Sequence, residues 1–147
     1  MRYPTSQGVE FIKGWETLAL VPYPCAAGVI TWGYGHARKR VEPVPESVTE
    51  EGAEQLLARD ITDACKSVLR LIRVPLTDEQ FDALVSFAFN VGGGALQRST
   101  LRQLVNREEH GDVPDEFLKW IRAGGKVLHG LVRRRRAEGE IYMEASG

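Results

Sequence analysis

The sequence predicts an α+β fold in which a small β-hairpin lobe lies beside a larger helical lobe, with a cleft between them. Its 147 residues, of which 43% are hydrophobic and 27% charged, suit one globular domain with a sizeable core. Prolines, glycines and β-branched residues in 22–36 exclude a helix and favour a hairpin. Later apolar residues recur every three or four positions, as in amphipathic helices. We expect a single domain over 1–147, with the first helix and β-lobe in about 1–48 and the helical lobe in 49–147.

The N-terminal elements follow from local patterns. A helix is expected over residues 6–19, because apolar residues recur at helical spacing after a threonine-serine start signal. Pro22 is expected to end this helix, which places Glu16 in or near its last turn. The hairpin over 22–36 follows, and a third short strand is expected at about 38–42.

The helical lobe opens with a long amphipathic helix, expected from Thr49 to about Ile72, with two glutamates in its first turn. Thr77 and Gln80 form a capping box that starts the next helix, and the glycines at 92–94 are expected to stop it. Three further helices are expected, starting near Ser99, after Asp112 and at about Gly130, the last of them ending near Met143.

The composition excludes several functional classes. A formal net charge of -1 argues against a nucleic-acid-binding polycation, and two cysteines make no disulfide framework. No apolar stretch of about 18 residues predicts a membrane span, and the N-terminus lacks the apolar core of a signal peptide. No spacing typical of a metal site or a dinucleotide site is present, so no metal or cofactor is expected. Because neither a membrane span nor a signal peptide is predicted, we expect the protein to accumulate in the cytoplasm.

One segment carries an uneven charge. Residues 117–136 contain seven cationic side chains and no aspartate or glutamate, and four of them are consecutive, Arg133 through Arg136. We expect one basic face whose natural partners are polyanions. A run of four arginines is usually a solvated helix face, which is the alternative interpretation.

Residues 15–36 (WETLALVPYPCAAGVITWGYGH) bring together polar groups of four chemistries, separated mostly by apolar residues and glycine. Glu16 has only uncharged immediate neighbours. A partly desolvated acid beside a small polar pocket is what general acid catalysis requires. Taken alone, Glu16 would more often be a solvated surface glutamate, and Thr31 an ordinary strand threonine.

The same segment resembles the catalytic block of the tailed-phage lysozymes, family 24 of the glycoside hydrolases, whose pattern reads roughly E-G-x-x-L-x-x-Y-x-D-x-x-G-x-x-T-I-G-x-G-H. The resemblance implies a lysozyme-like fold, with Glu16 as the proton donor to the glycosidic oxygen and Thr31 holding the hydrolytic water. Cys25 stands where most of the family has an aspartate, so it becomes the candidate second catalytic residue. The residues in register with the pattern are Glu16, Leu20, Tyr23, Gly28, Thr31, Gly33, Gly35 and His36.

Two later blocks extend the resemblance. Residues 87–104 are similar to a block that reads F-N-x-G followed by S-T-L, and residues 120–138 match W-x-x-A-G-G-K-x-x-x-G-L-x-x-R-R-x-x-E. By this match Phe89 and Asn90 line the far wall of the cleft, and Ser99 or Thr100 offers a hydroxyl. Phe89 suits core packing equally well. The candidate substrate-binding residues are His36, Phe89, Asn90 and Thr100. For His36, an orienting or ion-pair role and direct catalytic help are the alternatives.

The resemblance implies an endolysin that hydrolyses the β-1,4 bond between N-acetylmuramic acid and N-acetylglucosamine in bacterial peptidoglycan, for host cell lysis. It would be a monomer without cofactor or nucleic-acid partner, released from the host cytoplasm by a holin to act on the wall in the periplasm. Its basic C-terminal face would contact anionic wall polymers or the outer membrane.

Two other functions stay open from the sequence. A lytic transglycosylase uses a single glutamate and no attacking water, and the thiol at Cys25, in place of a second carboxylate, keeps this alternative open. A cell-wall binding module that has lost its second carboxylate is the other. Cys25 itself has three candidate roles: a thiolate base, a nucleophile, or a passive group beside a water held mainly by Thr31. Cys65 lies beside the apolar face of the long helix and is expected to be a small buried hydrophobic residue.

Overall fold

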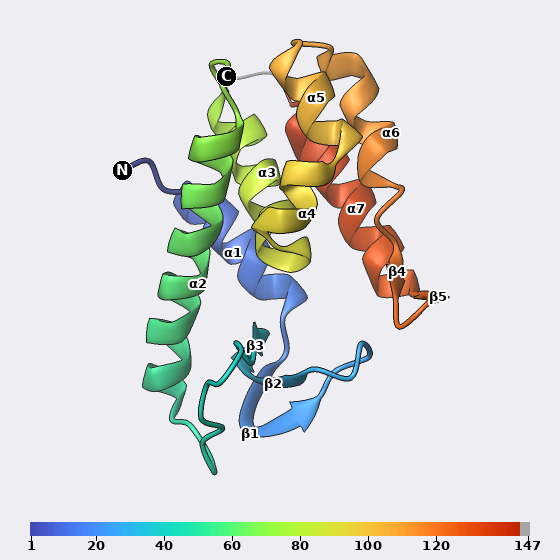
Figure 1. Ribbon diagram of the computed structural model, residues 1–147. Coiled ribbons are helices and arrows are strands. Elements are labelled where there is room, and N and C mark those ends of the chain that lie inside the picture. Colours follow the sequence, from blue (N-terminus) through green and yellow to red (C-terminus); the bar gives the residue numbers. More distant parts are fainter. Residues whose placement is uncertain (145–147) are drawn as a thin grey trace.

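The structure is a computed structural model that describes residues 1–144, and it confirms the predicted α+β architecture (Figure 1). Helix α1 (Ser6–Trp15) leads into an antiparallel sheet of β1 (Leu18–Pro24), β2 (Ile30–Tyr34) and β3 (His36–Ala37), in the order β1-β2-β3. The long helix α2 (Glu50–Leu71) then connects this sheet to a bundle of helices. The sheet therefore lies at one end of α2 and the bundle at the other.

The bundle is built around α3 (Asp78–Val91), which packs against α2 on one side and α7 (His129–Tyr142) on the other (Figure 1). Every residue of 81–88 in α3 is buried. The predicted capping box is present at its start, since Thr77 and Gln80 exchange side-chain-to-backbone hydrogen bonds. The remaining elements are α4 (Gly93–Arg98), α5 (Thr100–Asn106), the 3₁₀ helix η1 (His110–Asp112), α6 (Val113–Phe117), β4 (Arg122–Ala123) and β5 (Lys126–Val127).

The first helix is shorter than predicted. It ends at Trp15, because Glu16 already has extended backbone angles (φ -104°, ψ 129°) and Leu18 pairs with Tyr34 in the sheet. Pro22 consequently lies inside β1 and does not end the helix. The strand tolerates it because β1 is an edge strand whose register is irregular between residues 19 and 23.

The third strand lies earlier than the predicted 38–42. Ala37 pairs with Thr31, and the Arg38 backbone N–H still donates to the Ile30 carbonyl at 2.8 Å. Val41 has a φ of 58°, which a strand residue cannot adopt. The chain therefore leaves the sheet just after His36–Ala37.

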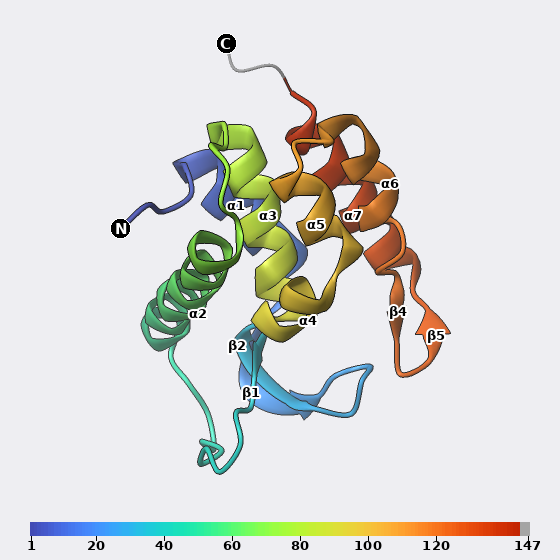
Figure 2. The ribbon, with the colours of Figure 1, turned by 45° about the horizontal axis from the view of Figure 1, so that its top comes forward.

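Two features of the helical lobe differ from the sequence prediction. Gly92 ends α3, but the next two glycines start α4. A Cβ atom at Gly93 would overlap the Ser67 hydroxyl of α2, so α4 packs close to α2 at this position. Residues 122–127 form an unpredicted hairpin whose turn uses Gly124 and Gly125 at φ 58° and 79°. A Cβ atom at Gly124 would lie only 2.9 Å from the Ala26 carbonyl oxygen, so this hairpin reaches the β1–β2 turn, as Figure 2 shows.

The prediction that the seven cationic residues of 117–136 share one basic face is wrong for two of them. Arg134 is 3% exposed and Arg135 is fully buried, whereas Arg133 and Arg136 are exposed. The physical reason is Glu138, a buried carboxylate on the next turn of α7 that pairs with both buried guanidinium groups.

Of the helices in residues 1–144, none is long and apolar enough to cross a membrane.

Candidate active site

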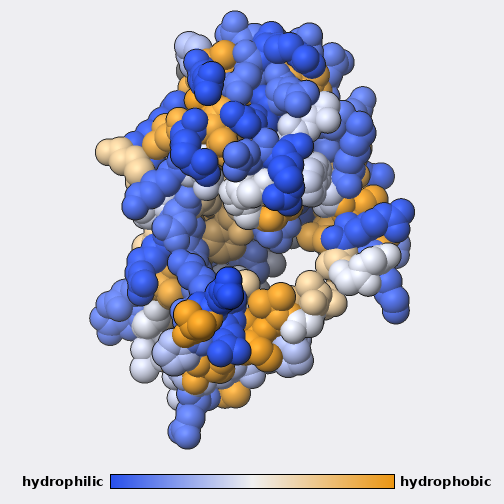
Figure 3. Space-filling view, in the orientation of Figure 1, coloured by the Kyte–Doolittle hydropathy of each residue, from blue (hydrophilic) through white to orange (hydrophobic). Residues whose placement is uncertain are grey.

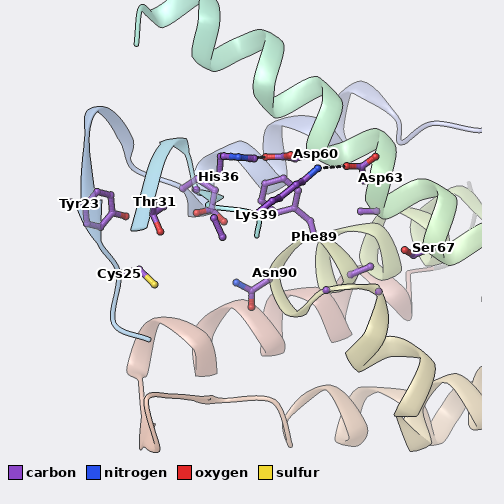
Figure 4. Close-up of a pocket in the computed structure, with 17 residues that line it drawn as sticks. Tyr23, Cys25, Thr31, His36, Lys39, Asp60, Asp63, Ser67, Phe89 and Asn90 are labelled. Atoms are coloured by element: carbon purple, nitrogen blue, oxygen red, sulfur yellow. Dashed lines mark hydrogen bonds and ion pairs between the residues drawn. The ribbon is translucent and has the colours of Figure 1, made fainter. Parts of the chain in front are cut away.

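A cleft of about 390 Å³ lies between the sheet and the helical bundle, and the space-filling view shows the hollow (Figure 3). The β-lobe supplies one wall, α2 supplies another, and the end of α3 with the following glycines supplies the third (Figure 4). Six of the seven predicted site residues line this cleft: Glu16, Cys25, Thr31, His36, Phe89 and Asn90.

The seventh, Thr100, does not line the cleft. It is exposed at the first position of α5, and its neighbour Ser99 caps that helix by accepting a hydrogen bond from the Arg102 backbone N–H at 3.0 Å. The S-T-L sequence therefore has a visible local role as a helix start.

Glu16 is positioned at the exact end of α1 by groups distant in sequence. Its Oε1 accepts a hydrogen bond from Arg134 Nη1 at 2.9 Å, and its side chain is 17% exposed. A Cβ atom at Gly35, where φ is 71°, would overlap the carboxylate. The acid is thus held between a buried cation and the β2–β3 turn, where Gly35 leaves the space for it.

Behind Arg134 lies a buried polar cluster that sequence reasoning missed. Glu138 lies 3.4 Å from Arg134 Nε and 2.9 Å from Arg135 Nε, and it accepts a hydrogen bond from the Ser86 hydroxyl at 2.6 Å. Arg135 in turn donates to Asn90 Oδ1 at 2.8 Å. The signal available in the sequence was the spacing of the arginine pair and Glu138 at i+3 and i+4 on one helix.

Cys25 starts the tight turn between β1 and β2. Its backbone N–H donates to the Val29 carbonyl at 2.9 Å, and Thr31 Oγ1 donates to the same carbonyl at 3.0 Å. Desolvation raises the pKa of the Cys25 thiol, but hydrogen bonds from the backbone at Ala27 and Val29 and from Thr31 outweigh it and leave that pKa below its ordinary value. The thiolate is therefore more accessible at neutral pH than in an ordinary cysteine.

His36 is buried between two carboxylates. Its Nδ1 lies 2.7 Å from Asp60 Oδ2 and its Nε2 lies 3.0 Å from Glu42 Oε1. The hydrogen bond to Asp60 raises the pKa of His36; burial opposes this, and Glu42 adds to it. Both ring nitrogens are engaged, so the geometry favours the ion-pair role, in which His36 ties the sheet to α2.

The α2 wall contributes residues that the sequence analysis did not single out. Asp60, Asp63 and Ser67 lie on one face of that helix, at helical spacing, and all three line the cleft. Lys39 reaches across from the β-lobe to pair with Asp63 at 3.3 Å (Figure 4). Within residues 1–144, no group of three or more histidine, cysteine, aspartate or glutamate side chains is arranged to hold a metal ion.

The phage lysozyme family matches residues 13–138 of this chain. The chain belongs to that family. It is 43% identical over 138 residues to the endolysin of Bacillus phage B103, covering 92% of this chain but 52% of that protein. It is 37% identical to the endolysin of Acyrthosiphon pisum secondary endosymbiont phage 1, covering 96% and 98% of the two chains.

Among solved structures, the endolysin from Escherichia coli O157:H7 phage FAHEc1 superposes with a TM-score of 0.84 at 35% identity, covering 98% of this chain and 94% of that one. The present chain thus spans about half the length of the Bacillus phage relative and nearly all of the other two. The lysozyme-like fold predicted from the sequence is confirmed.

Replacing Gly35 with alanine should displace the Glu16 carboxylate, because the new Cβ atom overlaps it. The matched control is Gly33→Ala, which imposes the same left-handed strain (φ 68°) but meets only ordinary contacts of 3.6 Å and beyond. We expect Gly35→Ala to lower peptidoglycan-clearing activity per folded molecule about 100-fold or more, the usual worth of a general acid. Gly33→Ala should lose stability only, and equal activity in the two variants would contradict the placement of Glu16.

The two carboxylates around His36 should make stability depend on pH. Since the folded pKa of His36 is raised, its contribution is complete below the unfolded value of about 6.5 and is lost as pH rises through the folded value. We expect the difference in unfolding free energy between wild type and His36→Asn to be largest near pH 6 and to shrink toward pH 9. Urea unfolding measures it, with the exposed His129→Asn as control. A difference independent of pH would exclude the ion pairs.

Proposed function

We propose that the chain is a lysozyme of the endolysin type that hydrolyses the β-1,4 bond between N-acetylmuramic acid and N-acetylglucosamine in bacterial peptidoglycan. The observation that carries the proposal is Glu16, a partly shielded acid in the cleft, held by the buried Arg134. Membership of the phage lysozyme family, and relatives named endolysins, support it.

In this proposal Glu16 gives its proton to the glycosidic oxygen of the leaving sugar. The carboxylate that remains is anionic, and the hydrogen bond from Arg134 Nη1 at 2.9 Å compensates that charge where it develops. Because Arg134 is buried and tied to Glu138, it needs little reorganisation when the proton leaves.

The second half of the reaction is assigned to Cys25 and Thr31. In an inverting glycosidase a base on the opposite face of the sugar activates the attacking water. The lowered pKa of the Cys25 thiol supports a thiolate in that role. The Thr31 hydroxyl donates its one proton either to the Val29 carbonyl or to the Cys25 thiolate, and in both cases it keeps its lone pairs for a water.

A lytic transglycosylase remains the second candidate, because Cys25 replaces the carboxylate that the family pattern has at this position. That reaction needs the acid but no attacking water, and it leaves an anhydro product. A non-catalytic wall-binding module is distinguished by binding to sacculi without clearing cells.

We also propose the biological setting that the resemblance implies. The protein would be a monomer, released by a holin from the cytoplasm of the host to act on the wall in the periplasm. The exposed cationic residues would contact anionic wall polymers or the outer membrane. They are fewer than the sequence suggested and comprise Lys119, Arg122, Lys126, Arg133 and Arg136.

Replacing Glu16 with glutamine should abolish clearing of chloroform-treated Gram-negative cells, roughly 100- to 10,000-fold, because the amide is nearly isosteric but donates no acidic proton. Glu10→Gln, an exposed position on the same helix outside the cleft, is the matched control and should stay near wild type. Mass spectrometry of the wild-type products should show reducing ends that contain the added water. Anhydro ends would establish the transglycosylase, and activity of Glu16→Gln within a few-fold of wild type would refute the acid.

Cys25 variants test the second catalytic position. We expect Cys25→Ser to lose most activity, since a hydroxyl does not ionise near neutral pH, and Cys25→Asp to keep a substantial part. Iodoacetamide should inactivate wild type but leave Cys25→Asp active, because Cys65 is fully buried and its thiol pKa is raised to about 11 by burial. Normal lysis by both Cys25→Ser and Cys25→Ala would leave the reaction to Glu16 and Thr31 alone.

A further inference from the structure

Asn90 lies at the junction of two hollows. It lines the catalytic cleft together with Glu16, and it also lines a groove that continues past Cys25 toward Trp120 and the β4–β5 hairpin. Its side chain is exposed, so its free polar atoms are accessible to a polymer that passes along the cleft. What these atoms offer depends on which way the amide is turned.

The orientation of the Asn90 side-chain amide is set by its hydrogen bond with Arg135. Arg135 Nη2 lies 2.8 Å from the Asn90 side chain, and the guanidinium is fully buried. Burial lowers the pKa of Arg135 to about 10, so the group is still protonated at neutral pH and only donates hydrogen bonds. Asn90 must therefore present its carbonyl oxygen to Arg135. Figure 4 shows the consequence: the amide nitrogen of Asn90 points to the Cys25 side of the cleft.

Two further contacts hold Arg135 in place. Its Nε lies 2.9 Å from Glu138 Oε1, and its guanidinium carbon lies 5.1 Å from the Phe87 ring centroid. Glu138 also anchors Arg134, the partner of Glu16. One buried carboxylate thus fixes the group that holds the acid and the group that orients Asn90.

We infer that Arg135 is a positioning residue that holds Asn90 as a hydrogen-bond donor to an amide carbonyl of the substrate, an inference that rests on the proposed peptidoglycan substrate. Peptidoglycan offers such a carbonyl on its N-acetyl groups and on its peptide stems. Both present the same acceptor chemistry, so the choice between them is left to the substrate used in the test.

The test measures binding in the Glu16→Gln background, so that no cleavage is needed. The probes are soluble glycan strands with peptides attached and the same strands freed of peptide by an amidase. Asn90→Asp keeps an acceptor for Arg135 but replaces the donor with a second acceptor, so it should fold with unchanged or raised Tm and bind about 10- to 100-fold more weakly. Gln97→Glu adds the same charge at an exposed site outside the cleft and is the control.

The positioning role is tested by Arg135→Met, which keeps the stem against Phe87 but lets the amide turn. If Arg135 acts through Asn90, the Kd of Asn90→Ala should not change when Arg135→Met is added, whereas a general structural effect would add to it. The side-chain NH₂ signal of Asn90 in a ¹⁵N spectrum should shift on adding glycan strands, and the shift should weaken in Arg135→Met. If Arg135→Met does not fold, the binding measured for Asn90→Asp decides the inference.

Each outcome decides something different. A defect of Asn90→Asp on both probes assigns the carbonyl to the N-acetyl groups, and a defect only on peptide-bearing strands assigns it to the stem. Wild-type affinity of Asn90→Asp, or additive effects of Asn90→Ala and Arg135→Met, would overturn the inference. Failure of the Glu16→Gln protein itself to bind either probe would instead refute the proposed substrate.

Discussion

The site depends on one buried carboxylate. Glu138 has no exposed surface and lies between Arg134 and Arg135, with the Ser86 hydroxyl as a further donor. Removing a partner from such a cluster leaves a buried charge uncompensated, which typically costs about 3–5 kcal/mol. The same cluster reaches the cleft at two points, Glu16 and Asn90, so the interaction that stabilises α7 against α3 also sets the geometry of the acid.

The β-lobe is tied to the rest of the molecule by a second set of charges. His36 pairs with Asp60 of α2 and with Glu42, and Gly35 beside it provides the backbone on which the Glu16 carboxylate rests. The sheet has little core of its own, so its position over the cleft is fixed by these contacts and by Trp32 and Tyr34, which are buried. Ion pairs between the β-lobe and α2 therefore help to fix the positions of these two walls of the cleft relative to each other.

Local signals explain what could be predicted from the sequence. Each of the successful predictions rests on one contiguous segment: the capping box at Thr77, and the helical periodicity of apolar residues along α2. The same holds for Glu16, Cys25 and Thr31, which are close in sequence and line one cleft in the structure. The end of α1 could not be predicted, because an apolar residue such as Leu18 fits a helix face and a strand equally well.

The burial of Arg134 could not be predicted from the sequence, because it depends on a contact between residues far apart in the chain. Its partner Glu16 lies 118 positions away. The local spacing of Glu138 at i+3 and i+4 from the arginine pair indicates ion pairs on one helix, but such pairs are also typical of a solvated face. The hairpin of residues 122–127 was missed because its strands have only two residues each, too short to show a period.

The two catalytic positions are held in different ways, and this difference explains how Cys25 can stand where the family pattern has an aspartate. Glu16 is held through its side chain, by the hydrogen bond from Arg134 and by the space that Gly35 leaves, so a residue of different size or shape would lose these contacts. Cys25 is held through its backbone, which bonds to Val29 and Gly28 in the turn. Such a turn keeps its geometry whichever small side chain it carries, so the chemistry at this position is free to change while the fold and the acid stay fixed.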